Sequence, residues 1–502
     1  MIVLHIIFRR IPVLCCAVFL ILMMGFSVSG TETEAPAEKI SGKTLMEEQK
    51  GFSSAKMLFD GRIKEPVKFR EDSHITLFHE NGIGSLYLVF DAEYGEYTVT
   101  DPDTQQTYIA GKDRFLHEFL DLVGIFGKAP ARVTLSFEHG EGKLNEISAY
   151  TPGKTPDSVQ KWQQPVEGGA DIVLFSTHGD DEQLFFAGLL PYYAAERNCQ
   201  VQVVYMTGHR NMSMRRSHEM LNGLWAVGVR TYPVFGPFAD YNTSSKTAAY
   251  QRYRQKGIME TDILSFVVEQ IRRFQPKVAV GHDLNGEYGH GMHMVYAENL
   301  CKAVEISADP AEFPESAETY GVWDVPKTYL HLYSENPIIM DWDQPLDSFD
   351  GMTAYEVTKK LGFPCHESQQ TYYSWYFSGK KTAADVSLYS PRKFGLYRSL
   401  VGEDLQKNDF LENVTTYAQD AALEQQRREE EKARKAAEEA ARLAAEAEEQ
   451  RLKAEAVKQT ETPAETMPIP EEKPVPEIVS VLAAVAVFVL AAAAIMMLRK
   501  KK

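Results

Sequence analysis

Two polar clusters, each following an apolar run, carry the side chains in this chain best suited to chemistry. The first, His178-Gly-Asp-Asp-Glu182, follows the run Asp171–Thr177, and the second, Asp283–His293, follows the run Lys277–His282. Such runs are typical of buried parallel strands. Because open α/β sheets bind ligands at the carboxyl ends of their strands, we expect the two clusters to meet in one crevice.

The residue types in these clusters suit zinc, which binds imidazole and carboxylate groups. His290 and His293 are three residues apart, which puts both rings on one helix face if a helix begins there. Three protein ligands with an open fourth position are typical of a catalytic zinc site. Asp180 or Asp181 could instead simply cap the helical pattern Gln183–Glu196, so the first cluster alone leaves both interpretations open.

The motifs resemble those of a known family. His178-Gly-Asp-Asp-Glu182 resembles the His-Pro-Asp-Asp-Glu motif of the PIG-L/LmbE-like zinc N-deacetylases. Asn285-Gly-Glu-Tyr-Gly-His-Gly-Met-His293 resembles that family's Asn-Gly-Glu-Tyr-Gly-His-Pro-Asp-His motif. Arg216–Glu219 and His366–Gln369 are similar to two shorter family motifs. The resemblance implies an α/β, Rossmann-like deacetylase domain, which we place at residues 165–415.

The resemblance also implies a metal site and a base. His178, Asp181 and His293 would bind Zn²⁺, and Asp180 would be the general base that deprotonates the attacking water. These implied roles agree with the physical chemistry. Zinc lowers the pKa of its water ligand to about 7. A nearby carboxylate that is not a metal ligand can accept the proton.

Four further residues have implied roles around the substrate. His290 and Tyr288 would face the developing oxyanion and help the amine leave, which stabilises charge that exists only in the transition state. Arg216 and Asp240 would bind substrate hydroxyl groups. Arg216 could equally pair with Glu219 or another acid, and Asp240 could be an ordinary turn residue.

The sequence departs from the family motifs at three positions. Gly179 and Gly291 stand where the family has Pro, and we expect them to loosen the backbone of both motifs. Met292 stands where the family has Asp. If that Asp supports His290 electrostatically, its loss lowers the pKa of His290 and weakens its role as a general acid.

Both ends of the chain predict a membrane protein. Residues 1–30 have two arginines, the apolar run Ile11–Phe26 and then small residues, which is the pattern of a secretory signal peptide. Residues 478–498 are apolar except for one serine, and are long enough to span a bilayer. Four basic residues follow, which favour the cytoplasmic side. We therefore expect a single-pass cell-membrane protein whose catalytic body lies outside the cytoplasm.

A charged segment separates the predicted catalytic domain from the predicted membrane helix. Residues 420–460 consist mostly of Ala, Glu, Lys, Arg and Gln, with opposite charges four residues apart that support a solvated helix. Residues 461–477 are rich in proline and predict a stiff linker. Together they predict a stalk. A coiled-coil dimer through this helix is the alternative.

Residues 44–158 differ from the rest of the chain and predict a β-sandwich. The closing segment Leu144–Tyr150 is similar to the last strand of galactose-binding-like jelly rolls, so the domain either binds glycan or is only structural. Five short strands are predicted, separated by turn residues: His74–His79, Ser85–Phe90, Tyr97–Thr100, Ala131–Phe137 and Asn145–Tyr150.

The net charge of −17 argues against nucleic acid as a partner. The sequence favours a zinc-dependent N-deacetylase that acts outside the cell on an N-acetylglucosamine-like sugar of a surface or wall glycan. One alternative is a non-catalytic surface protein that binds glycan through the β-sandwich. Another is a zinc amidase with a non-sugar substrate.

Overall fold

The computed structural model describes residues 35–63, 65–208 and 214–460. The chain divides into two compact units, Met1–Ala421 and Ala422–Lys502. The predicted signal peptide, Pro-rich linker and membrane helix all lie outside the described residues. Within the described ranges, no helix is both long and apolar enough to cross a membrane.

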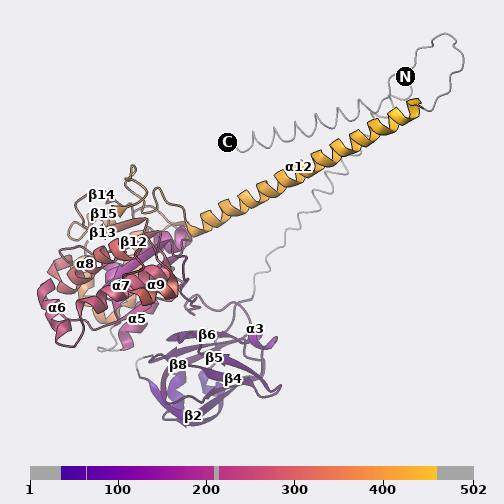
Figure 1. Ribbon diagram of the computed structural model, residues 1–502. Coiled ribbons are helices and arrows are strands. Elements are labelled where there is room, and N and C mark those ends of the chain that lie inside the picture. The colour runs from indigo at the N-terminus through magenta and orange to yellow at the C-terminus, as the bar shows by residue number, and fades with distance from the viewer. Residues whose placement is uncertain (1–34, 64, 209–213, 461–502) are drawn as a thin grey trace. The chain divides into compact units, whose positions relative to one another are not determined.

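The first unit begins with an antiparallel β-domain (Figure 1), as the sequence predicts. Its strands follow the order β5-β4-β7-β2-β8-β3-β6, with β1 beside β2. Alternating side chains fill its core: β7 buries Val133, Leu135 and Phe137 and leaves the residues between them partly exposed. The elements are β1 Met46–Phe52, β2 Val67–Phe78, β3 Ser85–Phe90, β4 Tyr97–Asp101, β5 Gln106–Ala110, β6 His117–Asp121, β7 Arg132–Phe137 and β8 Gly142–Tyr150, with the short helices α2 Gly42–Leu45 and α3 Leu122–Phe126.

All five predicted strands are present, but their arrangement differs from two separate sheets. Strand β2 pairs with β8 at residues 67–69 and with β7 at residues 73–78, so the strands form one hydrogen-bonded path. Strands β1, β5 and β6 were not predicted. The sequence of β1, Met-Glu-Glu-Gln-Lys-Gly-Phe, lacks apolar alternation, and its pairing with β2 holds it in place.

The second domain of this unit is an α/β domain around a mixed sheet of order β11-β10-β9-β12-β13-β15-β14. The first five strands in this order are parallel, and β14 and β15 are antiparallel additions. From β9 the chain proceeds outward to β10 and β11, then returns to place β12 on the other side of β9. The strands are β9 Ile172–Ser176, β10 Val201–Thr207, β11 Val234–Phe238, β12 Val278–Gly281, β13 Lys327–His331, β14 Pro337–Ile339 and β15 Lys393–Ser399.

The reversal between β9 and β12 is a topological switch point, where open α/β sheets bind their ligands. Both predicted polar clusters directly follow these two strands. Because the strands are parallel neighbours, their carboxyl ends lie side by side. The expectation that the two clusters meet in one place is therefore confirmed by the sheet topology.

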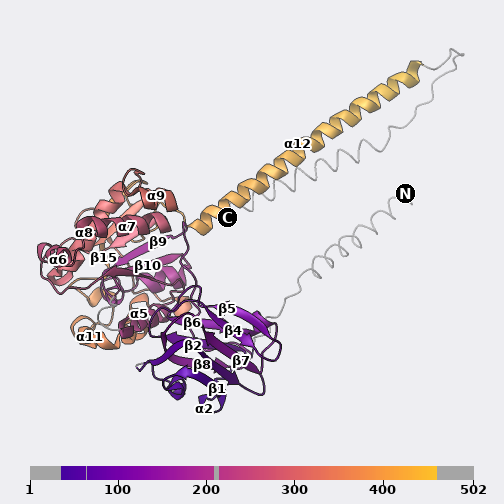
Figure 2. The same cartoon turned by 60° about the horizontal axis from the view of Figure 1, so that its bottom comes forward.

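Helices cover both faces of the sheet, which is why β9 is buried at every position and apolar from Ile172 to Phe175. Ile172 and Leu174 belong to one core with α5, and Val173 and Phe175 belong to the other with α7 and α8. Figure 2 shows α7, α8 and α9 on one side of the strands and α5 and α11 on the other. The helices are α4 Asp181–Leu184, α5 Met214–Ala226, α6 Lys246–Arg254, α7 Glu260–Phe274, α8 Gly291–Ile306, α9 Pro314–Tyr320, α10 Ala354–Val357 and α11 Gln370–Tyr376.

Two predicted helices have different bounds. The pattern Gln183–Glu196 is not one helix: α4 ends at Leu184, and a separate helical segment covers Pro191–Glu196. Gly188 lies between them at φ 95°, a conformation that favours glycine, and a Cβ there would meet Trp342 at 2.5 Å. Helix α8, the helix expected at His290 and His293, begins at Gly291, so His290 is its N-cap and only His293 lies within it.

Helix α12, Tyr417–Thr460, contains the predicted stalk. Its 44 residues correspond to about 65 Å at 1.5 Å per residue. Ion pairs four residues apart run along it, including Lys435–Glu431 and Lys453–Glu449, and its described side chains beyond Ala421 are exposed. The predicted dimerisation through this helix stays a prediction.

Candidate active site

A cavity of about 430 Å³ lies at the switch point. All but one of the residues that the sequence singles out line it: His178, Asp180, Asp181, Arg216, Asp240, Tyr288 and His290. The exception is His293, which is fully buried and contacts His178 and Asp181. The sheet therefore brings together two motifs that are more than a hundred residues apart in the chain.

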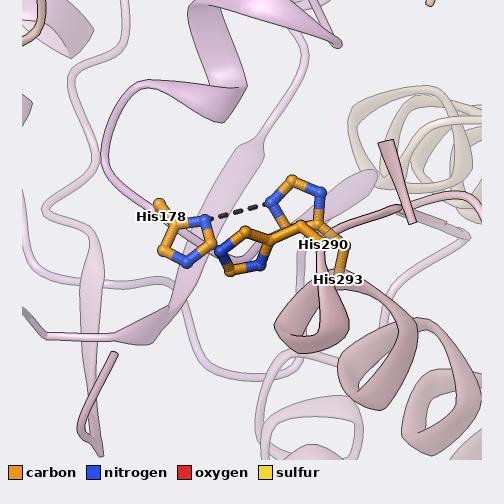
Figure 3. Close-up of side chains that lie close together, drawn as sticks. All are labelled: His178, His290 and His293. Atoms are coloured by element: carbon orange, nitrogen blue, oxygen red, sulfur yellow. Dashed lines mark hydrogen bonds between the residues drawn. The ribbon is translucent and has the colours of Figure 1, made fainter. Parts of the chain in front are cut away.

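Three side-chain atoms form a small triangle at the base of the cavity. His178 Nδ1 lies 3.0 Å from Asp181 Oδ2 and 3.0 Å from His293 Nε2, and the third side, His293 Nε2 to Asp181 Oδ2, measures 3.2 Å. Figure 3 shows the rings of His178, His290 and His293 gathered in one small space. All three residues of the triangle are at least 94% buried, so water does not screen these contacts.

This triangle fits a small divalent metal. Tetrahedral bonds of 2.0–2.1 Å place neighbouring ligand atoms about 3.3 Å apart, close to the observed sides. Two nitrogens and one carboxylate oxygen are also ligands that zinc accepts. The structure thus contains a buried His/Asp metal site, with His178, Asp181 and His293 as its geometrically matched ligands.

Two further groups of buried side chains lie within metal-binding distance of one another: His178, His290 and His293, and Asp181, His282 and His293. The hydrogen bonds of His282 exclude it as a ligand in this arrangement. Its Nε2 accepts the backbone N–H of Thr177 at 2.9 Å, and its Nδ1 donates to Glu287 Oε2 at 2.9 Å. Because both ring nitrogens are engaged, His282 is a supporting residue.

Glu287 is a fully buried carboxylate that holds three imidazoles. It accepts from His293 Nδ1 at 2.7 Å, from His282 Nδ1 at 2.9 Å and from His331 Nδ1 at 2.6 Å. Burial opposes its charge, but electrostatic attraction and hydrogen bonds from His282 and His293 outweigh burial and hold the pKa of Glu287 well below its usual range. The bond to Nδ1 of His293 directs Nε2 of the same ring into the metal site.

Asp240 supports the other histidine ligand. Its Oδ1 accepts from His178 Nε2 at 3.0 Å, which leaves Nδ1 facing Asp181 and His293. Burial opposes a charge on His178, but Asp240 and Asp181 outweigh it and raise its pKa to about 10. Asp240 also lines the cavity, so its predicted contact with substrate stays a prediction.

Asp180 lies beside the triangle without sharing in it. Its Oδ1 accepts from Arg216 Nη2 at 3.0 Å, and both side chains are buried. Burial raises the pKa of Asp180, and Arg216 partly offsets that rise. Arg216 thus pairs with an acid, but with Asp180, because Glu219 pairs with Arg215. Arg216 also lines the cavity, so its predicted contact with substrate stays a prediction.

His290 and Tyr288 line the same cavity as Asp180. His290 Nδ1 accepts the backbone N–H of Met292 at 3.3 Å, so in the neutral ring the proton resides on Nε2. Burial and then the neighbouring His178 lower the pKa of His290 to about 3. The direction matches the prediction made from Met292, but burial is the larger cause.

Tyr288 has an unusual backbone conformation for its type. Its φ is 46°, between two left-handed glycines, and 42% of the residue is exposed. Non-glycine residues at such angles are uncommon and gather at functional sites. Burial, then Asp181 and Asp180, raise the pKa of its phenol, which keeps the hydroxyl protonated as a hydrogen-bond donor.

The three departures from the family motifs pack closely. A Cβ at Gly179 would meet the side chain of Met220 at 2.2 Å, and one at Gly291 would meet the backbone oxygen of Ser245 at 2.4 Å. Gly291 also donates its backbone N–H to Thr243 at 2.7 Å, a bond that proline cannot make. Met292 is buried in the apolar core beside α7. Close packing therefore accounts for both glycines better than the predicted loosening.

Several functional residues were missed or undervalued from the sequence. Glu287 stands inside the quoted motif, which was the available signal, but its three partners are spread over 50 residues of chain. His331 ends strand β13 and had no motif to mark it. His366 is fully buried, with its Nε2 2.9 Å from Glu182 Oε1, and it is not among the residues that line the cavity.

Comparison with known proteins agrees with this geometry. Residues 173–304 match the family model described as PIG-L, GlcNAc-PI de-N-acetylase. The chain contains a PIG-L family deacetylase domain. That span begins in β9 and ends in α8, and includes both motifs that build the metal site.

Similar curated proteins are bacterial deacetylases. The chain is 26% identical over 214 residues to the 1D-myo-inositol 2-acetamido-2-deoxy-alpha-D-glucopyranoside deacetylase 1 of Catenulispora acidiphila, which covers 38% of this chain and 65% of that protein. It is 23% identical over 249 residues to the corresponding deacetylase of Thermobispora bispora, a match that covers 45% of this chain and 77% of that protein. The chain spans less than two thirds of the length of the first relatives it matches: the matched region covers 65% of the Catenulispora acidiphila protein and 60% of the Streptomyces scabiei deacetylase.

Solved structures with some similarity include the N,N'-diacetylchitobiose deacetylase from Pyrococcus horikoshii, at 15% identity and a TM-score of 0.29. That match covers 45% of this chain and 84% of the other. A module named CpGH89CBM32-6 from Clostridium perfringens matches 23% of this chain and 99% of its own, at 17% identity and a TM-score of 0.19.

Proposed function

We propose that this protein is a zinc-dependent N-deacetylase that hydrolyses the acetamide of an N-acetylglucosamine-type sugar. The observation that carries the proposal is the triangle of His178, Asp181 and His293 with a separate carboxylate, Asp180, beside it. Hydrolysis of an amide needs a Lewis acid, a base and an oxyanion donor, and the cavity offers residues for each.

Zinc bound by the triangle would polarise the amide carbonyl and make water a nucleophile at neutral pH. Asp180 accepts the proton of the attacking water, because it lines the cavity and is not one of the triangle atoms. Arg216 holds Asp180 in place through one oxygen, Oδ1. The same carboxyl group can then return its proton to the leaving amine.

His290 and Tyr288 serve the oxygen that becomes negative in the transition state. His290 presents its Nε2–H, and Tyr288 presents its hydroxyl, from the wall of the same cavity. Donors fixed in position before the reaction stabilise this charge without reorganisation. His290 acts here as a neutral donor rather than as an imidazolium.

The experiment that tests the proposal is acetate release from an N-acetylglucosamine glycoside by the zinc-loaded chain. Acetate from the parent chain and its loss in Asp180→Asn would support it; Asp113→Asn, on an exposed residue of the β-domain, is the matched control. Zinc binding without acetate from any N-acetyl sugar would favour the amidase with a non-sugar substrate. Glycan binding with neither zinc nor acetate would favour the non-catalytic surface protein.

The location of the protein is a further part of the proposal. Residues 1–30 and 478–498 support a body outside the cytoplasm that is anchored in the membrane, facing a surface or wall glycan. Protease added to intact cells tests it, because only an external body is cleaved. Protection of the chain until the cells are lysed would contradict this location.

A further inference from the structure

Helix α11, Gln370–Tyr376, places aromatic side chains at the mouth of the active-site cavity. Tyr376 is 3% exposed and donates its hydroxyl to the backbone oxygen of Tyr389 at 2.8 Å, and the next residue, Phe377, is fully buried. These two residues anchor the helix. Its other face is therefore held firmly in front of the cavity.

Tyr372 and Trp375 lie on the side of α11 that faces the cavity. The two residues are three positions apart, which places them on one side of the helix, and their ring centroids are 6.5 Å apart. Both line the cavity, yet Tyr372 is 40% exposed and Trp375 is 44% exposed. Tryptophan is usually well buried, so an exposed indole beside a polar cavity points to a binding surface.

The rings form a series from the metal site outward. The ring of Tyr288 lies 5.5 Å from that of His293, and the ring of Trp375 lies 6.1 Å from that of Tyr288 in an edge-to-face arrangement. Tyr389 contacts Trp375 on another side, at 6.0 Å. The indole of Trp375 therefore contacts Tyr288, the residue that we place beside the reacting amide, on the side away from the metal site.

This arrangement matches the shape of a sugar chain. A pyranose ring has an apolar face of C–H groups that packs on an aromatic ring, while its hydroxyls stay in water. The base of the cavity is polar and suits the reacting sugar, whereas α11 contributes aromatic side chains and carries no charged residue of its own. A neighbouring sugar, joined to the reacting one, would reach the mouth.

We propose that Trp375 and Tyr372 form a second sugar subsite, so that the preferred substrate is an oligosaccharide and not a single N-acetyl sugar. This inference rests on the proposed deacetylase function for the choice of ligand. It assigns the first sugar to the polar base and the next sugar to the aromatic face of α11.

The test compares a trisaccharide of N-acetylglucosamine with the methyl glycoside of the single sugar. We expect Trp375→Ala to lower the ratio of their kcat/KM values by roughly tenfold, the scale for truncating one well-packed aromatic anchor. Trp375→Phe, which keeps an aromatic face, should restore most of the ratio. A ratio equal to that of the parent, whether both rates fall or neither does, would overturn the subsite.

Calorimetry separates this proposal from the deacetylase function. If the parent releases no acetate, the deacetylase proposal fails, and trisaccharide affinity decides the subsite alone. Binding that is roughly tenfold weaker in Trp375→Ala than in the parent would support the subsite. Equal affinity would overturn it. Because both chains carry the same β-domain, any binding there cancels in this comparison.

Discussion

Replacing Glu287 with glutamine tests how the histidine ligands are held. The carboxylate is fully buried and accepts from three imidazoles, two of them through Oε2 and one through Oε1. Glutamine keeps the shape but replaces one oxygen with an N–H donor. The least costly orientation puts that donor on the Oε1 side, which keeps the bonds from His282 and His293 to Oε2. His331, whose Nε2 donates to the backbone oxygen of Ser390 at 3.0 Å, can accept the new N–H at Nδ1, so the bond that is lost is the one from the backbone N–H of Asp283 to Oε1.

The magnitude follows from this orientation. His293 keeps an acceptor for its Nδ1–H, but the acceptor is neutral, so the ring becomes a weaker metal ligand. Loss of such outer support typically costs about 10- to 100-fold in metal affinity, and the single lost bond points to the lower end, about tenfold. The unpaired backbone N–H of Asp283 should lower the free energy of unfolding of the metal-free chain by about 1–3 kcal/mol.

The assay is zinc competition with a chromophoric chelator, together with urea unfolding of the metal-free chain. The matched control is Glu298→Gln on α8, the helix that carries His293, where the carboxylate pairs with Lys246 and Lys302 near the surface. The control should keep the zinc affinity of the parent. Equal zinc affinity in Glu287→Gln and the parent would refute the reasoning that Glu287 directs His293 toward the metal.

Three further substitutions have expected outcomes. Asp180→Asn should keep zinc and lose at least about a hundredfold in acetate-release rate, the scale for removing a general base; an unchanged rate would remove Asp180 from the mechanism. His293→Ala should lose the metal, measured by elemental analysis; zinc at parent stoichiometry would mean that another residue, such as His290, is the ligand. Gly179→Ala should lower the free energy of unfolding by about 1–3 kcal/mol, because the added methyl group overlaps the side chain of Met220. Urea unfolding measures this change. A free energy of unfolding equal to that of the parent would show that the Met220 side chain moves aside freely.

The sequence predicted those residues of the site that directly follow a strand. His178, Asp180 and Asp181 follow one apolar run, and His290 and His293 follow another, so a parallel sheet was enough to bring them together. The order of strands around the switch point then fixed the crevice.

What the sequence did not predict depends on tertiary contacts between distant segments. The bond of Glu287 to His331 joins residues 44 positions apart, and Trp375 reaches the cavity only because α11 is anchored by its buried aromatic residues. The packing of Gly179 against Met220 was also invisible, since a motif comparison shows only which residue is replaced. Such contacts leave no periodic pattern in the chain.

The central claim is that one metal ion, bound by His178, Asp181 and His293, drives amide hydrolysis. The most direct measurement is a titration of the metal-free full chain with zinc while acetate release from an N-acetylglucosamine glycoside is recorded. The rate should rise in proportion to added zinc and level off at about one equivalent per chain. A rate that is independent of zinc, or saturation with zinc without any acetate, would contradict the claim.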